Sequence, residues 1–510
     1  MKTHLVFAIM TVALLALVIT QNRESSFTFQ HVIRQAQDAA RKPFVPVSPV
    51  KSDALRNLTY DQYRDIRWKD EGTLWRNLGL PFQAKFFFTG ALNSTPVTVY
   101  QVNRDSVRPI RFTPEMFNYG RLNSIPYEEQ QKGGFSGFRV HYPINKPDYL
   151  DEVLVMLGAS YFRSLAKDQV YGLSARGIAI DTGSNVKKEE FPSFTTFWLA
   201  QPGNTDKTLT LYALLDGPSA TGAYRFTIQP GVETVIDVHA VLFLRKEIDL
   251  LGIAPLTSMY WYGENTSNTF GDWRPEVHDS DGLLVHGGND EWVWRPLAWS
   301  KLLQINDFGT TNPRGFGLLQ RDRDFAHYQD LEAHYHRRPS VWIEPSGDWG
   351  KGSVRLIQFP TDNEFMDNVV AFWHTDRTHA AGDRIELNYR MTWRGSDPSE
   401  GDIARSVATR IDYQEQEFYR VFVLDFAGEA LGKLPAETQL QPEISIGGAG
   451  AGVIDKVNVQ KNTNDNSWRV SFTASTTVLR KSHEIRCVLK NNGKPVAETW
   501  TYTWTPNEPR

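Results

Sequence analysis

Charged and aromatic side chains that could do chemistry together are concentrated between residues 263 and 296. A loop exposed only to solvent is seldom so aromatic, whereas loops on a rigid scaffold often carry binding and catalytic residues. The charged and aromatic residues of this stretch include Glu264, Asp272, Trp273, Arg274, Glu276, His278, Asp279, Asp281, Asp290, Glu291, Trp292, Trp294 and Arg295. More Trp, Tyr and carboxylate side chains follow as far as Trp373. Two such carboxyl groups could act as acid and base, although loop charges and Arg partners are the commoner fate of an Asp.

Other kinds of active site lack their sequence patterns. His278, His286, His334 and His336 have no metal-ligand spacing, so we expect no metal site. The glycines at 287–288 are not followed by the Lys-Ser/Thr pair of a phosphate-binding loop, and there is no Gly-x-Ser-x-Gly elbow. We expect no cofactor. Composition permits the two-carboxylate chemistry of glycoside hydrolysis without requiring it.

Composition narrows the class of protein further. The 510 residues include 55 Lys+Arg and 59 Asp+Glu, a net charge of −4, so we expect no nucleic-acid partner. The single Cys, Cys487, cannot form an intramolecular disulfide, and we interpret it as a core residue. The 15 Trp, 19 Tyr and 29 Phe fit either a sugar-binding cleft or the aromatic-rich core of a β-sandwich.

The N-terminus indicates export. Residues 5–20 form an apolar run that follows Lys2 and His4 and precedes a polar stretch. The run is short for a membrane span and typical of a secretory signal. We interpret residues 1–22 as a signal peptide or an uncleaved anchor, because no Ala-x-Ala cleavage site follows them.

Period-two alternation of apolar residues predicts a large, mostly antiparallel β domain over residues 23–394. Helical spacing predicts short helices in residues 26–51 and 61–67, and we expect another helix over 151–157. The clearest alternating runs are 85–89, 97–102, 208–215 and 224–228.

A Gly-, Ser- and Asp-rich segment at 395–402 has the composition of a linker. We therefore expect a separate domain over 403–510. About seven short strand-like runs in this region are typical of an immunoglobulin-like sandwich. They include 418–426, 443–446, 453–459, 468–474, 484–489 and 498–505.

Several long motifs resemble the periplasmic glucans biosynthesis protein G and D family, and the similarity extends over about residues 30–505. The motifs are GFSGFR at 134–139, LGASYFR at 157–163, YGLSARG at 171–177, APLTSM at 254–259, RPEVHDSDG at 274–282 and RGFGLLQR at 314–321. The resemblance implies an all-β fold with a large galactose-mutarotase-like sandwich followed by a small immunoglobulin-like sandwich. It also implies a periplasmic location and a role in making osmoregulated periplasmic glucans, which have a β-1,2-linked glucose backbone.

The resemblance further implies an endo-β-1,2-glucanase that inverts the anomeric centre. The family's two catalytic residues fall on Asp279 and Asp367, which are 88 positions apart (367 − 279) and must meet from different strands or loops. An inverting enzyme holds its two carboxyl groups about 6.5–9.5 Å apart, to leave room for water. We assign Asp367 as the general acid and Asp279 as the general base, with a water or a sugar hydroxyl as a possible relay.

We select four side chains as candidates for sugar contacts: Tyr335, Trp294, Arg295 and Trp349. Core packing or a structural ion pair is an equal alternative for each of them. Three functions stay open. The first is hydrolysis of β-1,2-glucan. The second is a non-catalytic glucan-binding or assembly factor that works with a membrane glucan synthase. The third, sugar epimerisation, would need a His–Glu pair on the same fold.

Overall fold

The computed structural model describes residues 27–104, 106–122, 125–266, 270–401, 403–412, 419–447, 453–475 and 482–505. The interpretation of residues 1–22 as a signal or anchor lies outside these ranges. Within them, no helix is both long and apolar enough to cross a membrane.

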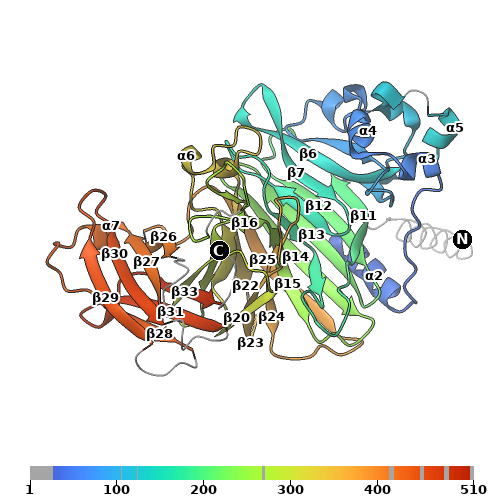
Figure 1. Ribbon diagram of the computed structural model, residues 1–510. Helices are drawn as coiled ribbons and strands as arrows, with labels where there is room; N and C mark the ends of the chain where they lie inside the picture. Colours follow the sequence, from blue (N-terminus) through green and yellow to red (C-terminus); the bar gives the residue numbers. More distant parts are fainter. Residues whose placement is uncertain are drawn as a thin grey trace, which may run out of the picture.

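The all-β fold is confirmed, with two large sheets packed on each other (Figure 1). The first sheet has the strand order β2-β6-β7-β8-β9-β15-β24-β23-β20, with β10 beside β15. Its strands are β2 (Gln83–Phe88), β6 (Phe135–Lys146), β7 (Tyr149–Leu157), β8 (Tyr161–Ser164), β9 (Ser174–Arg176), β10 (Ile178–Ile180), β15 (Leu251–Ser258), β20 (Gln304–Thr311), β23 (Lys351–Gln358) and β24 (Val369–Thr375).

The second sheet has the strand order β28-β31-β33-β19-β18-β21-β22-β25-β14-β13-β12-β11-β3-β4, with β32 beside β31. Its strands are β3 (Thr98–Asn103), β4 (Ser106–Pro109), β11 (Ser193–Ala200), β12 (Leu209–Asp216), β13 (Ala220–Gln229), β14 (Thr234–Leu244), β18 (Gly282–His286), β19 (Trp292–Pro296), β21 (Gly315–Leu319), β22 (Ser340–Ser346), β25 (Arg384–Arg394), β28 (Gln441–Ile446), β31 (His483–Asn491), β32 (Lys494–Pro495) and β33 (Thr499–Trp504). Two short pairs, β1 (Arg67–Trp68) with β5 (Phe117–Asn118) and β16 (Tyr260–Tyr262) with β17 (Val277–His278), lie outside these sheets.

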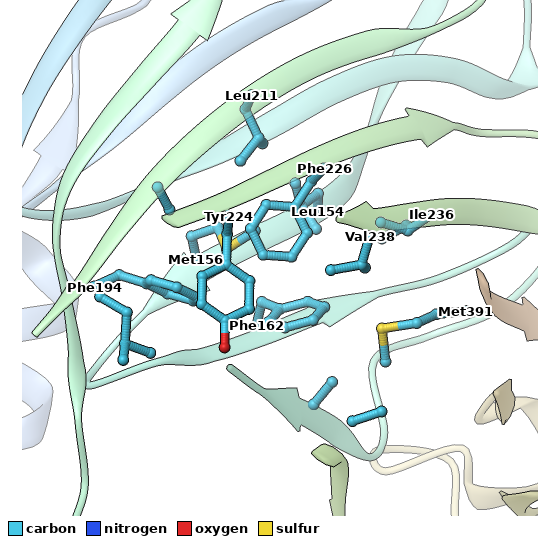
Figure 2. Packing of buried hydrophobic residues seen from close by; sticks show 14 of the residues in the cluster. Leu154, Met156, Phe162, Phe194, Leu211, Tyr224, Phe226, Ile236, Val238 and Met391 are labelled. Atoms are coloured by element: carbon cyan, nitrogen blue, oxygen red, sulfur yellow. The ribbon is translucent and has the colours of Figure 1, made fainter. Parts of the chain in front are cut away.

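Alternating apolar residues form the core between the sheets. Along β12 every second residue, from Leu209 to Leu215, is buried, as its period-two pattern predicts. Figure 2 shows Phe162 of β8 facing Tyr224 and Phe226 of β13, and the Phe162 and Phe226 ring centroids are 5.4 Å apart. Much of the aromatic content of the chain is therefore used for core packing.

In the described ranges, helices are few and short. The predicted N-terminal helix is α2 (Phe29–Ala40), whose buried Val32, Ile33 and Ala36 pack on β12, β13 and β14. The helix predicted in 61–67 is α4 (Tyr60–Asp65). The remaining short helices are α3 (Asp53–Arg56), α5 (Tyr127–Gln130), α6 (Phe325–Tyr328), α7 (Glu429–Gly432), η1 (Asp70–Gly72), η2 (Arg76–Leu78), η3 (Pro114–Met116), η4 (Gly120–Leu122) and η5 (Tyr335–Arg337).

The helix expected over 151–157 is wrong, because this segment is strand β7. It pairs with β6 on one side and β8 on the other. Apolar residues at 153, 154 and 156 suit a helix and a buried strand equally well, and strand pairing decides between them.

The predicted C-terminal strand runs are present and form two sheets, seen as the orange and red lobe of Figure 1. One is a four-stranded sheet of β26 (Arg405–Asp412), β27 (Tyr419–Ala427), β30 (Trp468–Ser475) and β29 (Ile454–Lys461). The other, β28-β31-β33, continues the second large sheet, because β33 pairs in parallel with β19. Buried Cys487 and Trp500 share one hydrophobic cluster with Trp294 of β19. The two parts of the chain are therefore joined through both a sheet and a core.

Candidate functional site

Asp279 directly follows strand β17, which pairs with β16. Its backbone N–H donates to the carbonyl of Met259 at 2.8 Å, so the strand pair fixes the position of the residue. Its side chain is buried and forms an ion pair with Arg338. Burial raises the pKa of Asp279, and the positive charge of Arg338 lowers it. Arg338 thus stabilises the charged form of a carboxyl group that has little contact with water.

Asp367 lies two positions before strand β24 and is held by its neighbour Asn368, which directly precedes the strand. The Asn368 amide accepts a hydrogen bond from the backbone N–H of Tyr260 at 2.9 Å and donates one to the Tyr260 carbonyl at 3.0 Å. The Asp367 side chain is 42% exposed and lies 3.5 Å from a guanidinium nitrogen of Arg163 on β8. One carboxyl group of the predicted pair is therefore open to solvent.

The structure brings Asp279 and Asp367 together. Both are anchored to the same segment. Asp279 is bonded to Met259, and Asn368, the neighbour of Asp367, is bonded to the next residue, Tyr260. The negative charge of Asp367 raises the pKa of Asp279, and the positive charge of Arg163 lowers it. Such effects are strong only over short distances. The two carboxyl groups therefore belong to one site, with Arg163 and Arg338 beside them.

Tyr335 lies beside this pair. The Arg338 guanidinium lies over the Tyr335 ring, 4.3 Å from the centroid. The Tyr335 hydroxyl donates a hydrogen bond to Glu364. Burial is the main cause that raises the pKa of Tyr335, so the phenol stays protonated at neutral pH. Glu364 in turn forms an ion pair with Arg274 at 2.8 Å. Of the four residues selected for sugar contacts, Tyr335 is the one that the structure connects to Asp279.

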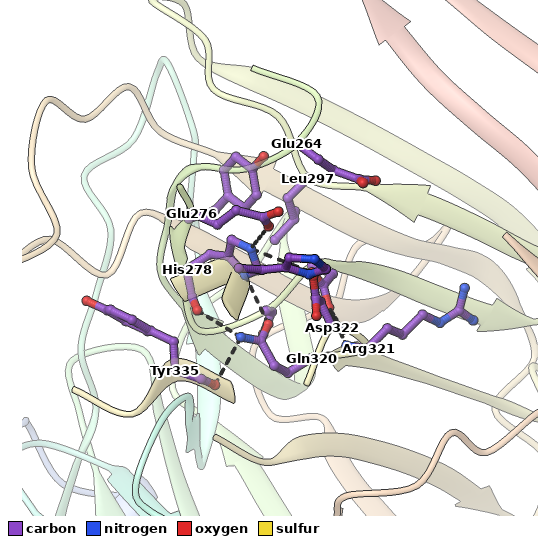
Figure 3. Close-up of polar contacts among 12 residues, drawn as sticks. Glu264, Glu276, His278, Leu297, Gln320, Arg321, Asp322 and Tyr335 are labelled. Atoms are coloured by element: carbon purple, nitrogen blue, oxygen red, sulfur yellow. Dashed lines mark hydrogen bonds and ion pairs between the residues drawn. The ribbon is translucent and has the colours of Figure 1, made fainter. Parts of the chain in front are cut away.

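Figure 3 shows a buried hydrogen-bond network around His278, the residue before Asp279. His278 contacts Glu276 through Nε2 at 2.9 Å and Gln320 through Nδ1 at 3.0 Å. The Gln320 amide donates to the carbonyls of His278 and Tyr335, at 3.0 and 3.1 Å. It therefore ties the segment that carries Asp279 to the segment that carries Tyr335.

Carboxylates near His278 could hold a cation. Glu276, His278 and Asp281 bring three possible ligand atoms within 4.8 Å of one another, as do Glu276, Asp322 and His327. Burial lowers the pKa of His278, but the surrounding carboxylates outweigh it and raise the value to about 9. At neutral pH the His278 side chain is therefore an imidazolium paired with carboxylates.

The other three selected residues have structural contacts. Trp294 is buried at the C-terminal junction, with the Arg321 guanidinium 3.6 Å from its ring centroid. Arg295 donates to Thr501 at 3.0 Å. Trp349 is buried against Trp373 and Tyr389 in the main core. Within the described part of the chain, none of their hydrogen bonds, ion pairs or ring contacts involves Asp279 or Asp367.

Sequence reasoning gave no role to Arg163, Arg338, Arg274 or Glu364, although Arg274 belongs to the charged and aromatic stretch at 263–296. Arg163 and Arg274 each lie in a motif that carries the family resemblance. Arg338 and Glu364 lie in no such motif, and their partners are 59 and 90 positions away, so no local pattern could identify them.

The protein is thus a two-sheet β protein whose site holds two carboxyl groups, those of Asp279 and Asp367, among Arg and Tyr side chains. A family model described as "Periplasmic glucan biosynthesis protein, MdoG" matches residues 27–504, and the chain belongs to this family. The chain is 43% identical to the glucans biosynthesis protein G of Ralstonia nicotianae over 506 residues. That alignment covers 98% of this chain and 99% of the relative. Family membership supports a role in periplasmic glucan biosynthesis.

Proposed function

We propose that the protein is a periplasmic, inverting endo-β-1,2-glucanase that acts on the glucan backbone. The observation that carries the proposal is the meeting of Asp279 and Asp367 in one site. Glycoside hydrolysis with inversion needs two carboxyl groups, one that protonates the leaving oxygen and one that activates water. No cofactor is needed for this reaction.

The two environments favour different roles. Asp367 is 42% exposed, so the glycosidic oxygen of a bound chain can reach it, and we assign it as the general acid. Burial raises the pKa of Asp279, and its ion pair with Arg338 opposes that rise. A carboxylate with a raised pKa accepts a proton from water more readily than an ordinary one, so we assign Asp279 as the general base. Because Asp279 is buried, it would take its proton through a water or a sugar hydroxyl.

The proton of Asp367 moves to the oxygen that leaves as the glycosidic bond breaks. A water molecule attacks the anomeric carbon from the opposite face and gives its proton to Asp279. The product carries the α configuration at its new reducing end. A proton then returns from Asp279 to Asp367 through solvent.

The proposal is tested with linear β-1,2-glucan and the exported form of the protein. We expect the wild type to release reducing ends, and NMR to detect the α-anomer first. Asp279→Asn and Asp367→Asn should each lower kcat by about 100-fold or more. Asp148→Asn is the matched control, because Asp148 is exposed in the β6–β7 turn.

The outcomes separate hydrolysis from glucan binding without catalysis. A wild type that binds glucan but never releases reducing ends would contradict hydrolysis and leave a glucan-binding factor that serves a membrane synthase. Full activity in both Asn variants would contradict the site. A first product in the β configuration would contradict inversion.

A further inference from the structure

One Trp residue differs from the others in its exposure. Of the 15 Trp residues, thirteen are buried and Trp299 is half-buried, whereas Trp273 is 72% exposed. Single exposed apolar side chains are common and need no explanation by themselves. The surroundings of Trp273 are what indicate a role for it.

The residues on both sides of Trp273 are fixed by ionic contacts. The Arg274 guanidinium binds the Asp272 carboxylate twice, at 3.0 and 2.7 Å. Arg274 is 8% exposed, and it also binds Asp330 and accepts a hydrogen bond from the Tyr262 hydroxyl at its carbonyl. The backbone at Trp273 is therefore held in place while its indole ring stays in water.

A second exposed aromatic residue adjoins the same network. Arg274 forms an ion pair with Glu364 at 2.8 Å, which joins the Trp273 loop to the loop before β24. Phe365, the next residue after Glu364, is 89% exposed. Asp367 follows two positions later. The Arg274–Glu364 pair thus links two exposed rings to the segment that carries one of the two site carboxyl groups.

The network continues to the other carboxyl group. Glu364 accepts a hydrogen bond from Tyr335, whose ring lies under Arg338, and Arg338 pairs with Asp279. A continuous chain of contacts therefore runs from the backbone beside Trp273 to Asp279, and Glu364 within that chain lies three positions before Asp367.

We propose that Trp273, assisted by Phe365, is a sugar-binding platform for a glucan chain. The C–H face of a glucosyl residue is apolar and would stack on the indole ring, while polar groups around the site bind its hydroxyls. Naming the ligand as β-1,2-glucan rests on the proposed function. A second copy of the chain is the alternative occupant of this surface.

The test measures binding of linear β-1,2-glucan in an Asp367→Asn background, so that the ligand is not cut. Iodide quenches exposed indoles, and Trp273 is the most exposed of the 15 Trp residues, all of which the structure describes. We expect glucan to protect this fluorescence from iodide. Trp273→Ala should raise Kd for glucan about tenfold, and Trp273→Phe should recover most of the affinity. Tyr60→Ala is the matched control, because Tyr60 is 71% exposed on α4.

The proposal is overturned if Trp273→Ala binds glucan as tightly as the parent protein. It is also overturned if glucan gives no protection and Trp273→Ala instead lowers the mass of the protein in solution, because a second copy would then cover the ring. The proposed function is judged separately, by reducing-end release in the wild type. A wild type that binds glucan through Trp273 without cutting it would support the platform and contradict the hydrolase.

Discussion

Asn368 is hydrogen-bonded to both backbone groups of Tyr260, at 2.9 Å to the N–H and 3.0 Å to the carbonyl. The same amide donates to the Phe359 carbonyl at 3.0 Å. The Asn368 amide therefore makes hydrogen bonds like those of a neighbouring strand's backbone, just before β24. These bonds fix the backbone next to Asp367. Because Tyr260 adjoins Met259, which holds Asp279, this one side chain sets how the two carboxyl groups lie relative to each other.

Asn368→Ala should lower both activity and stability. Two backbone groups of buried Tyr260 and the carbonyl of half-buried Phe359 would lose this partner, which costs about 1–3 kcal/mol of unfolding free energy. Displacement of Asp367 should lower kcat by roughly tenfold or more with a smaller change in KM. Urea unfolding and reducing-end assays measure the two effects, with exposed Asn388→Ala as the control. An unchanged kcat in a destabilised variant would show that Asn368 is structural only.

Arg338→Gln should shift the pH dependence of hydrolysis. Arg338 lowers the pKa of Asp279, so its removal raises that pKa and requires a higher pH to ionise the base. The acidic limb of the kcat/KM profile should therefore move to higher pH. The control is Arg377→Gln, since Arg377 is exposed after β24. A profile that keeps its acidic limb while its height falls would rule out Asp279 as the base.

Glu264→Gln should stabilise the protein above neutral pH. Burial raises the pKa of Glu264 from 4.5 to about 7, although its carboxylate accepts a hydrogen bond from the Thr409 N–H across the junction. A raised carboxyl pKa gives stability that is full below pH 4.5 and lost as the pH rises through 7. The Gln side chain stays neutral and keeps an acceptor. We expect a gain of about 1 kcal/mol at pH 8, reduced by partial solvent exposure, and none at pH 4.

Thermal and urea unfolding at pH 4, 6 and 8 check this expectation, with Glu437→Gln as the exposed control. An equal change at every pH would mean that the side chain acts through packing and that its charge is irrelevant.

The strands and the catalytic candidates were more predictable than the sugar-contact residues. Alternation along β12 is visible in the sequence because one face of the strand is buried. Asp279 and Asp367 were selected through the family motifs, and the structure brings them together. Trp349 and Trp273 have the same side chain and similar neighbours in sequence, but opposite exposure. Exposure depends on distant partners such as Tyr389, which no local pattern contains.

The contacts that join the two parts of the chain also could not be predicted from local sequence patterns. The composition of 395–402 is that of a linker, yet Asp397 and Ser399 are buried. Asp397 binds Arg321 at 2.7 Å, 76 positions earlier in the chain. The parallel pairing of β33 with β19 likewise depends on residues about 200 positions apart. Such long-range contacts are determined by the assembled fold.

Glu498 of the segment before β33 binds Arg321, which precedes β22, and so holds the two parts of the chain together. Its carboxylate is fully buried, binds Arg321 at 2.6 and 3.0 Å and accepts the Ser406 N–H at 2.7 Å. Glu498→Ala would leave Arg321 buried with one carboxylate partner, Asp397. Breaking a buried pair from one side typically costs about 3–5 kcal/mol.

We therefore expect Glu498→Ala to lower the unfolding free energy by about that amount, measured with urea, whereas the exposed Glu443→Ala should change it by less than about 1 kcal/mol. Because both parts share a sheet and a core, the main sandwich and the C-terminal strands should unfold together in the wild type. Buried Trp residues report on both parts, so fluorescence and far-UV circular dichroism should give coincident transitions. Two separate transitions in the wild type would contradict the coupling, because each part would then be stable without the contacts that Glu498 and Arg321 make.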